Sequence, residues 1–198
     1  MKAKQTGSVL LLSLLMLLIL TMVGVASIGN VTLNERMASN YRDHDISFQA
    51  AEAALKEGER QAINYSLSFN EDDFQGGCTT GSCFTSACDN GFCFNGTYPV
   101  SGECDVVPAA SPLWLDDTTW ATAGVARESV VSFPTLPVKP KYIVEFLCYV
   151  VADATAGTPS IPPPYGVDWA YMYRITSYAE GSSGGSRTML QSTYKVLK

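Results

Sequence analysis

The sequence has little of what enzymes and nucleic-acid-binding proteins need. It contains one histidine, His44, and its 13 lysine and arginine residues face 19 aspartate and glutamate residues, which gives a formal net charge of -6. Nucleic-acid binding requires a basic surface, so this charge argues against it. His44 lies between two aspartates on a part of the chain predicted to be an exposed helix face. We therefore expect no enzymatic activity, no cofactor and no small-molecule substrate.

Charge is absent from residues 5–34, and proline is absent before Pro99. An uncharged stretch of this length is too long for the core of a signal peptide and long enough for a helix to cross a bilayer. Lys2 and Lys4 precede the stretch and would hold that end in the cytoplasm. The chain from about Glu35 onward is therefore expected to be exported.

The helix is predicted to continue past the membrane. Apolar residues recur there at steps of three, four or seven, which indicates one stripe of a helix: Leu33, Met37, Tyr41, Phe48, Ala51, Leu55 and Ala62. We predict one helix over 8–64, with a membrane anchor at 8–30 and an outer half that packs against a sheet. Gly24 and Gly29 are its weak points, either as hinges or as sites of close helix packing.

The second part of the chain, 65–198, is predicted to form an exported globular domain. Three strands rich in Tyr, Val, Ile and Thr are expected at 141–151, 169–178 and 187–197. The glycine- and serine-rich linker 181–186 is expected to be the hairpin loop between the last two. An antiparallel sheet packed on a long helix is an α+β architecture.

Cysteine is absent from the first 77 residues, so every thiol lies on the exported side. Five of the six fall within or at the end of a cysteine-rich loop insert at 76–104, and the full set is Cys78, Cys83, Cys88, Cys93, Cys104 and Cys148. Oxidising compartments favour disulfides, whereas the four-residue spacers lie at the wide edge of structural zinc spacing. Six cysteines allow fifteen pairings. We favour Cys104 with Cys148, and the other four among themselves.

Two acidic pairs, Asp72-Asp73 and Asp116-Asp117, offer oxygen atoms that calcium could use. Both pairs lack the alternating spacing and the glycine of a calcium-binding loop. We therefore interpret them as turn or helix-cap residues and expect no metal site.

The Gly7-Ser8 junction separates the basic leader, 1–7, from the apolar run. Cleavage at this junction would remove the charges and leave the apolar helix on the mature protein. A basic leader that ends in glycine and is followed by such a helix resembles the prepilin signal of type IV pilins and pseudopilins.

Further segments sharpen this resemblance. Residues 32–40 and 48–55 are similar to the N-terminal signature of PilX-type minor pilins. Three segments near the other end, 142–145, 173–176 and 190–194, are similar to the closing strands of that family. The resemblance covers roughly residues 1–63 and 139–197, and it implies a pilin-like fold.

The resemblance also implies roles for residues at the start of the mature chain. A prepilin peptidase would cleave between Gly7 and Ser8, and Ser8 would then be the candidate for N-methylation. Most pilins have glutamate as the fifth mature residue, where it neutralises the amine of a neighbouring subunit, but this chain has Leu12. A subunit at the pilus tip has no neighbour ahead of it, so Leu12 suits a tip position.

By this resemblance the protein is a minor pilin. It would be held in the inner membrane, with a cytoplasmic N-terminus, until it is incorporated at or near the tip of the extracellular pilus. Its partners would be other minor pilins, the major pilin and a large tip adhesin, and its role would be to prime assembly and support adhesion and twitching motility. Two alternatives remain open: a tip pseudopilin of a type II secretion system, and a membrane-anchored periplasmic binding or metal module built on the cysteine cluster.

Overall fold

The computed structural model describes residues 8–68, 83–94, 104, 112–160 and 168–197. The chain divides into two units, Met1–Arg42 and Asp43–Lys198. The first unit holds the start of helix α1, and the predicted leader lies outside the described residues. The second unit holds the rest of α1 and a five-stranded sheet. Together they form a pilin-like α+β fold.

Helix α1 runs from Ser8 to Ser68, which is four residues beyond the predicted end. In the first unit the valine, leucine and methionine side chains of the helix and that of Ile19 are exposed, and this part is long and apolar enough to cross a membrane. The hydroxyls of Ser13 and Thr21 donate to backbone carbonyls three residues earlier, at 2.9 and 2.8 Å. These polar atoms are thus satisfied within the helix, and the surface of the helix suits an apolar environment.

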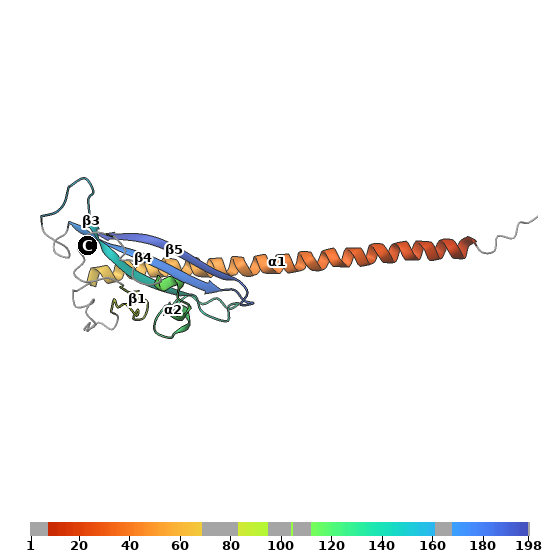
Figure 1. Ribbon diagram of the computed structural model, residues 1–198, viewed down its shortest axis with the longest axis horizontal. Helices are drawn as coiled ribbons and strands as arrows, with labels where there is room; N and C mark the ends of the chain where they lie inside the picture. Colours follow the sequence, from red (N-terminus) through yellow and green to blue (C-terminus); the bar gives the residue numbers. More distant parts are fainter. Residues whose placement is uncertain (1–7, 69–82, 95–103, 105–111, 161–167, 198) are drawn as a thin grey trace, which may run out of the picture. The chain divides into compact units, whose positions relative to one another are not determined.

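The sheet has the order β1-β3-β4-β5, and β2 also pairs with β3. Its strands are β1 (Phe92–Cys93), β2 (Arg127–Glu128), β3 (Lys141–Val151), β4 (Trp169–Glu180) and β5 (Arg187–Leu197). Strand β1 is parallel to β3, and the other pairs are antiparallel. Two of the three predicted strands have the predicted bounds, and β4 is two residues longer. Figure 1 shows β3, β4 and β5 alongside the orange-to-yellow end of α1.

Within the second unit, α1 contacts the sheet through small side chains. The small buried residues of this helix face are Ser47, Ala50, Ala51, Ala54, Gly58, Ala62 and Ser66. Large buried residues of the sheet oppose them, including Tyr142, Tyr173 and Ile175. Because the rings of the sheet fill the interface, the helix backbone can come close only where its own side chains are short.

The predicted helix stripe is therefore correct only in part. Ala51 and Ala62 are buried and Leu55 is partly buried, but Phe48 is 41% exposed. The predicted stripe residues of the first unit, Leu33, Met37 and Tyr41, are also exposed. The apolar period correctly indicated a helix, whereas the buried face is set by residue size and not by hydrophobicity alone.

The opposite face of the sheet is covered at β3 by segments that precede it in the chain. These include the 3-10 helix η2 (Leu113–Leu115) and the short helix α2 (Asp117–Ala121). Trp120, Ala126 and Ile143 form a buried cluster there with the disulfide-bonded Cys88 and Cys93. Asp116 caps α2 by accepting a hydrogen bond from Thr118 N at 2.9 Å, which confirms the cap interpretation for this residue. Asp72 and Asp73 lie outside the described residues.

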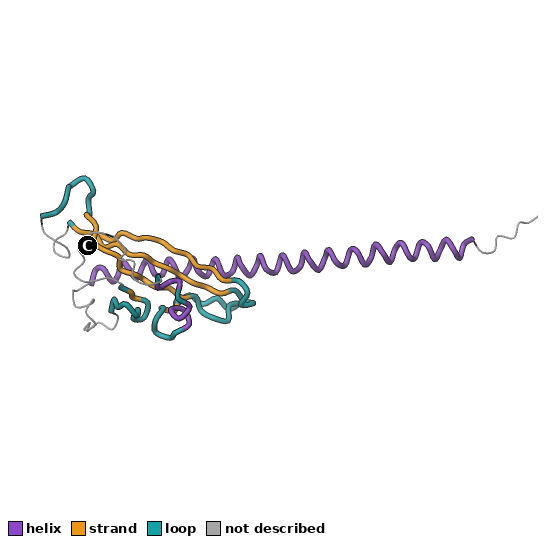
Figure 2. The backbone as a smooth tube through the Cα atoms, in the orientation of Figure 1, coloured by secondary structure: helices purple, strands orange, loops and turns teal. Residues whose placement is uncertain are grey.

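The loops β2–β3 and β4–β5 meet at one end of the sheet (Figure 2). Phe133 and Leu136 of the first loop pack with Ala50 and Ala51 of α1 and with Ala179 of β4. The same stretch of helix therefore supports both a long loop and the end of the hairpin.

We predict that Gly58→Ala destabilises the globular unit by about 1 to 3 kcal/mol, because overpacking costs that much in well-packed cores. A Cβ atom at Gly58 would lie 2.6 Å from Ile175 Cγ2 and 3.1 Å from Tyr142 Cδ2. Thermal unfolding of the full-length protein in detergent, followed by near-ultraviolet circular dichroism, measures this change.

Gly24→Ala is the matched control, since a Cβ atom at this position of the same helix meets nothing within 4 Å. It should leave the melting temperature of the globular unit unchanged. A Gly58→Ala protein as stable as the wild type would contradict the close packing of helix and sheet.

Candidate functional site

The residues that the sequence links to leader cleavage and to filament assembly lie at or just before the start of α1. Gly7 lies outside the described residues, and Ser8 is the first residue of the helix. Leu12 lies one turn further along, with a side chain that is 62% exposed. Its neighbours Leu11 and Leu15 are also exposed. Position 12 therefore presents an apolar group on an apolar helix surface, and no carboxylate.

Asp43 anchors the β4–β5 hairpin to α1 within the second unit. Its carboxylate accepts hydrogen bonds from Ser182 Oγ at 2.7 Å, from Ser183 Oγ at 2.7 Å and from Ser183 N at 3.2 Å. The bonds from the Ser182 and Ser183 hydroxyls lower the pKa of Asp43 to about 2. Gly181 also belongs to this contact, because a Cβ atom there would collide with the Asp43 carboxylate. We call this set of contacts the hairpin anchor.

Ser47 extends the hairpin anchor by one helical turn. Its hydroxyl forms hydrogen bonds with Thr188 Oγ1 at 2.7 Å and with Ser186 Oγ at 3.1 Å. It also donates to the carbonyl of His44 at 2.8 Å. The start of β5 is thereby fixed on the same helix face as the hairpin loop. The sequence analysis predicted the loop but not its attachment, since no local pattern marks Asp43 or Ser47 as buried.

Glu57 is a buried carboxylate in the middle of the helix–sheet interface, with only 4% of its surface exposed. It accepts hydrogen bonds from Ser129 Oγ at 2.6 Å, from Val130 N at 3.0 Å and from the Tyr142 hydroxyl at 3.3 Å. Burial raises the pKa of Tyr142, so that its hydroxyl stays protonated and can donate. A buried carboxylate is tolerated when several donors face it. These donors tie the segment after β2 to α1.

A second buried charge lies within the sheet. Glu145 of β3 and Arg174 of β4 are directly opposite each other, and two hydrogen bonds of 2.8 and 2.9 Å join them side by side. The bonds to Glu145 raise the pKa of Arg174. The sequence patterns did not predict this pair, although a signal was present: Glu145 and Arg174 are charges in the interior of their strands, whereas the other charges, Lys141 and Glu180, lie at strand ends.

One disulfide joins the loop before β1 to that strand, and another joins the cysteine-rich insert to β3. Cys88 pairs with Cys93, with Cα atoms 4.2 Å apart, and Cys104 pairs with Cys148, with Cα atoms 5.1 Å apart. The second pair is the one that the sequence analysis favoured, and it joins the insert to a fully buried position of β3. Cys83 is also disulfide-bonded, and Cys78 lies outside the described residues. These oxidised sulfurs are not thiolates that could bind a metal.

Residues 181–185 match the Gly-x-Ser-x-Gly pattern of hydrolase nucleophiles. In the structure they form the hairpin loop, in which the Ser183 hydroxyl donates to Asp43. A carboxylate with a pKa of about 2 is too weak a base to activate a hydroxyl near neutral pH. His44 is exposed, as predicted. The pattern therefore serves the hairpin anchor and not catalysis.

We predict that the hairpin anchor is weakened by acid. Because the pKa of Asp43 falls from its ordinary value of 3.8 to about 2 on folding, its contribution to stability is present above pH 4 and is lost as the pH falls toward 2. Asp43→Asn should lower the melting temperature at neutral pH and reduce the loss of stability between pH 4 and pH 2. Thermal unfolding across this pH range measures both effects.

Asp45→Asn is the matched control, because it removes the same charge two residues away. Asp45 accepts one exposed hydrogen bond, from Gln49 Nε2 at 2.9 Å. If the two variants show the same melting temperatures and the same pH dependence, the anchor has no energetic importance.

Two family models match the chain. The first, described as PilX N-terminal, matches residues 6–56, and the second, described as Type IV pilus assembly protein PilX C-term, matches residues 73–196. The second match includes the cysteine-rich middle, which the resemblance of individual segments had left out. No curated protein and no solved structure matches the chain. With its long apolar helix and disulfide-linked sheet domain, the chain belongs to the PilX family of type IV pilus assembly proteins, a family of structural pilins and not of enzymes.

Proposed function

We propose that this protein is a minor pilin that primes assembly of the type IV pilus and takes a position at or near its tip, where it supports adhesion and twitching motility. Membership of the PilX family supports the role in pilus assembly. The observation that carries the tip position is Leu12, an exposed apolar residue where most pilins have a glutamate.

The cost of burying an unpaired charge favours a tip position for a subunit with leucine at residue 12. Inside a filament the free amine of each mature pilin lies in an apolar core, where an unpaired charge is strongly unfavourable. A subunit with leucine at this position cannot neutralise the amine of a subunit ahead of it. The first subunit of a filament has no subunit ahead, so it needs no carboxylate.

The remaining steps follow from the order of segments along the chain. Prepilin peptidase removes residues 1–7 and leaves Ser8 as the new N-terminus and the candidate for N-methylation. The apolar part of α1 holds the protein in the inner membrane, with the globular unit on the exported side. Its partners during assembly are the other minor pilins, the major pilin and a large tip adhesin.

The two alternatives have less support. A type II secretion pseudopilin shares the apolar helix, but both matching family models are those of PilX, and one is described as a type IV pilus assembly protein. A metal module needs free thiolates, whereas Cys83, Cys88, Cys93, Cys104 and Cys148 are all disulfide-bonded. The pilus function is therefore the one that we carry forward.

We predict that the mature protein begins at Ser8. Gly7→Leu should block cleavage and leave a full-length, membrane-retained chain, because the peptidase must accommodate this residue beside the cut. Gly7→Ala, with a small side chain, is the control and should be cleaved to a much greater extent. N-terminal sequencing and intact mass measure the start, and a mature protein that begins beyond Val25 would contradict the pilin mechanism.

We predict that Leu12→Glu leaves the number of surface pili unchanged or lower. At the tip the new carboxylate has no amine ahead of it and would have to protonate or disturb the apolar packing. Leu12→Gln is the control, since it adds polarity without charge. Pilus counts and the amount of this subunit in sheared pili measure the effect. A clear increase of both with glutamate, but not with glutamine, would indicate a position inside the filament.

A further inference from the structure

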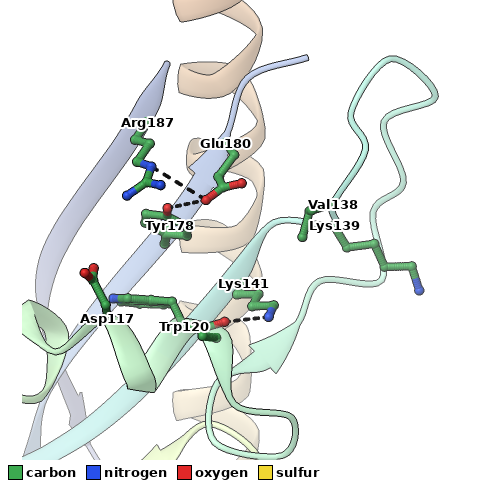
Figure 3. A pocket seen from close by; sticks show the side chains of 9 residues that line it. Asp117, Trp120, Val138, Lys139, Lys141, Tyr178, Glu180 and Arg187 are labelled. Carbon is green, nitrogen blue, oxygen red and sulfur yellow. Dashed lines mark hydrogen bonds and ion pairs between the residues drawn. The ribbon is translucent and has the colours of Figure 1, made fainter. Parts of the chain in front are cut away.

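The globular unit contains a pocket of about 390 Å³, which Trp120 of the buried cluster at α2 helps to line. It lies between α2, the first residue of β3, the end of β4 and the beginning of β5, as Figure 3 shows. Ligand pockets in proteins occupy roughly 300 to 1,000 Å³, so this one has room for a small ring compound. The chemistry of its walls decides which kind of compound fits.

One wall is aromatic. Trp120 stacks on Tyr178 with ring centroids 5.1 Å apart and planes inclined by 23°. The Tyr178 hydroxyl donates to Glu180 Oε1 at 2.6 Å, and burial raises the pKa of Tyr178 to about 12, so this hydroxyl is neutral at physiological pH. Val138, which is 42% exposed, adds an apolar group to the lining. Rings with C–H faces pack favourably on walls of this composition.

The lining also carries hydrogen-bond donors with positive charge. Lys141 is half-buried and donates to the carbonyl of Trp120 at 2.6 Å, and it has no carboxylate partner among the residues that the structure describes. Arg187 is held beside the pocket by one contact of 3.7 Å from its Nε to Glu180. Lys139 likewise pairs with a carboxylate, Glu128, at 3.7 Å, and its ammonium points away from the other residues in Figure 3. Lys141 is therefore the cation of this lining that has no carboxylate partner among the described residues.

The lining of the pocket also contains hydrogen-bond acceptors. Asp117 and Glu180 both line the pocket. Two carboxylates would repel a simple anion such as phosphate, and an apolar ligand would strip water from charged groups without replacing their hydrogen bonds. A ligand that satisfies this lining must offer several hydroxyl groups, one negative charge and a compact ring.

We propose that this pocket binds an acidic sugar residue, a uronic acid at the end of a glycan chain. Its carboxylate would lie at Lys141, and its hydroxyls would donate to Asp117 and Glu180. The ring would pack beside Trp120 and Tyr178. The proposal does not depend on a tip position, because the pocket lies wholly within one globular unit.

The test is calorimetric titration of the full-length mature protein in detergent with glucuronic acid, glucose or acetate. We expect saturable binding of glucuronic acid, with glucose and acetate each weaker by about tenfold or more. Glucose has the ring without the charge, and acetate has the charge without the ring. The comparison among these three compounds needs no variant, so it does not depend on the folding of a mutant.

Variants then locate the site. Lys141→Gln should weaken glucuronic acid binding by about tenfold, and Lys141→Arg should largely retain it. Lys56→Gln is the control, because Lys56 lies outside the pocket in a surface ion pair with Glu52 of 3.2 Å. Melting temperatures of all variants show whether each is folded.

Several results would overturn the proposal. The first is the absence of saturable heat with glucuronic acid up to about 10 mM. The second is binding of glucose or of acetate that is as tight as that of glucuronic acid. The third is an equal loss of glucuronic acid binding in the Lys56→Gln and Lys141→Gln variants. Tighter binding of an acidic peptide than of glucuronic acid at the same pocket would also overturn it, since the partner would then be a protein.

Discussion

The close approach of α1 to the sheet is the constraint on which the rest of the globular unit depends. The helix presents alanine, serine and glycine to a sheet face filled with tyrosine, phenylalanine and isoleucine, and at Gly58 there is no space for even one additional carbon. The short distance between helix and sheet brings the carboxylates of Asp43 and Glu57 within hydrogen-bond distance of loops far away in the sequence. A helix with larger side chains on this face would move Asp43 and Glu57 away from their hydrogen-bond partners.

The parts of α1 before and after Asp43 differ in the side chains that they expose, and each part suits a different environment. Before Asp43 the helix is largely apolar and exposed, which suits lipid or the apolar core of a filament. From Asp43 onward it serves as the core element of a folded domain. Polar contacts at Asp43, Ser47 and Glu57 hold the hairpin and the segment after β2 on the helix. Disulfides join the loop before β1 to that strand and Cys104 to β3.

Much of this fold could be predicted from the sequence because its signals are local. The three long strands follow from runs of β-branched and aromatic residues, and the hairpin follows from its glycines. The buried helix face could not be predicted in the same way, because a search for large apolar residues selects Phe48 and overlooks Gly58. The partners of Asp43 and Glu57 are 139 and 72 residues away or further, so no local pattern reveals them. The pocket likewise combines residues from α2 and three strand ends, which only the folded chain brings together.

We propose that this PilX-family pilin, which lacks the usual glutamate, occupies the end of the filament. Immunogold labelling of sheared pili, with antibodies raised against the folded globular unit, tests this claim most directly. We expect gold particles at one end of each labelled pilus and none along its length. Particles distributed along the filament, or pili that carry no label at either end, would contradict it.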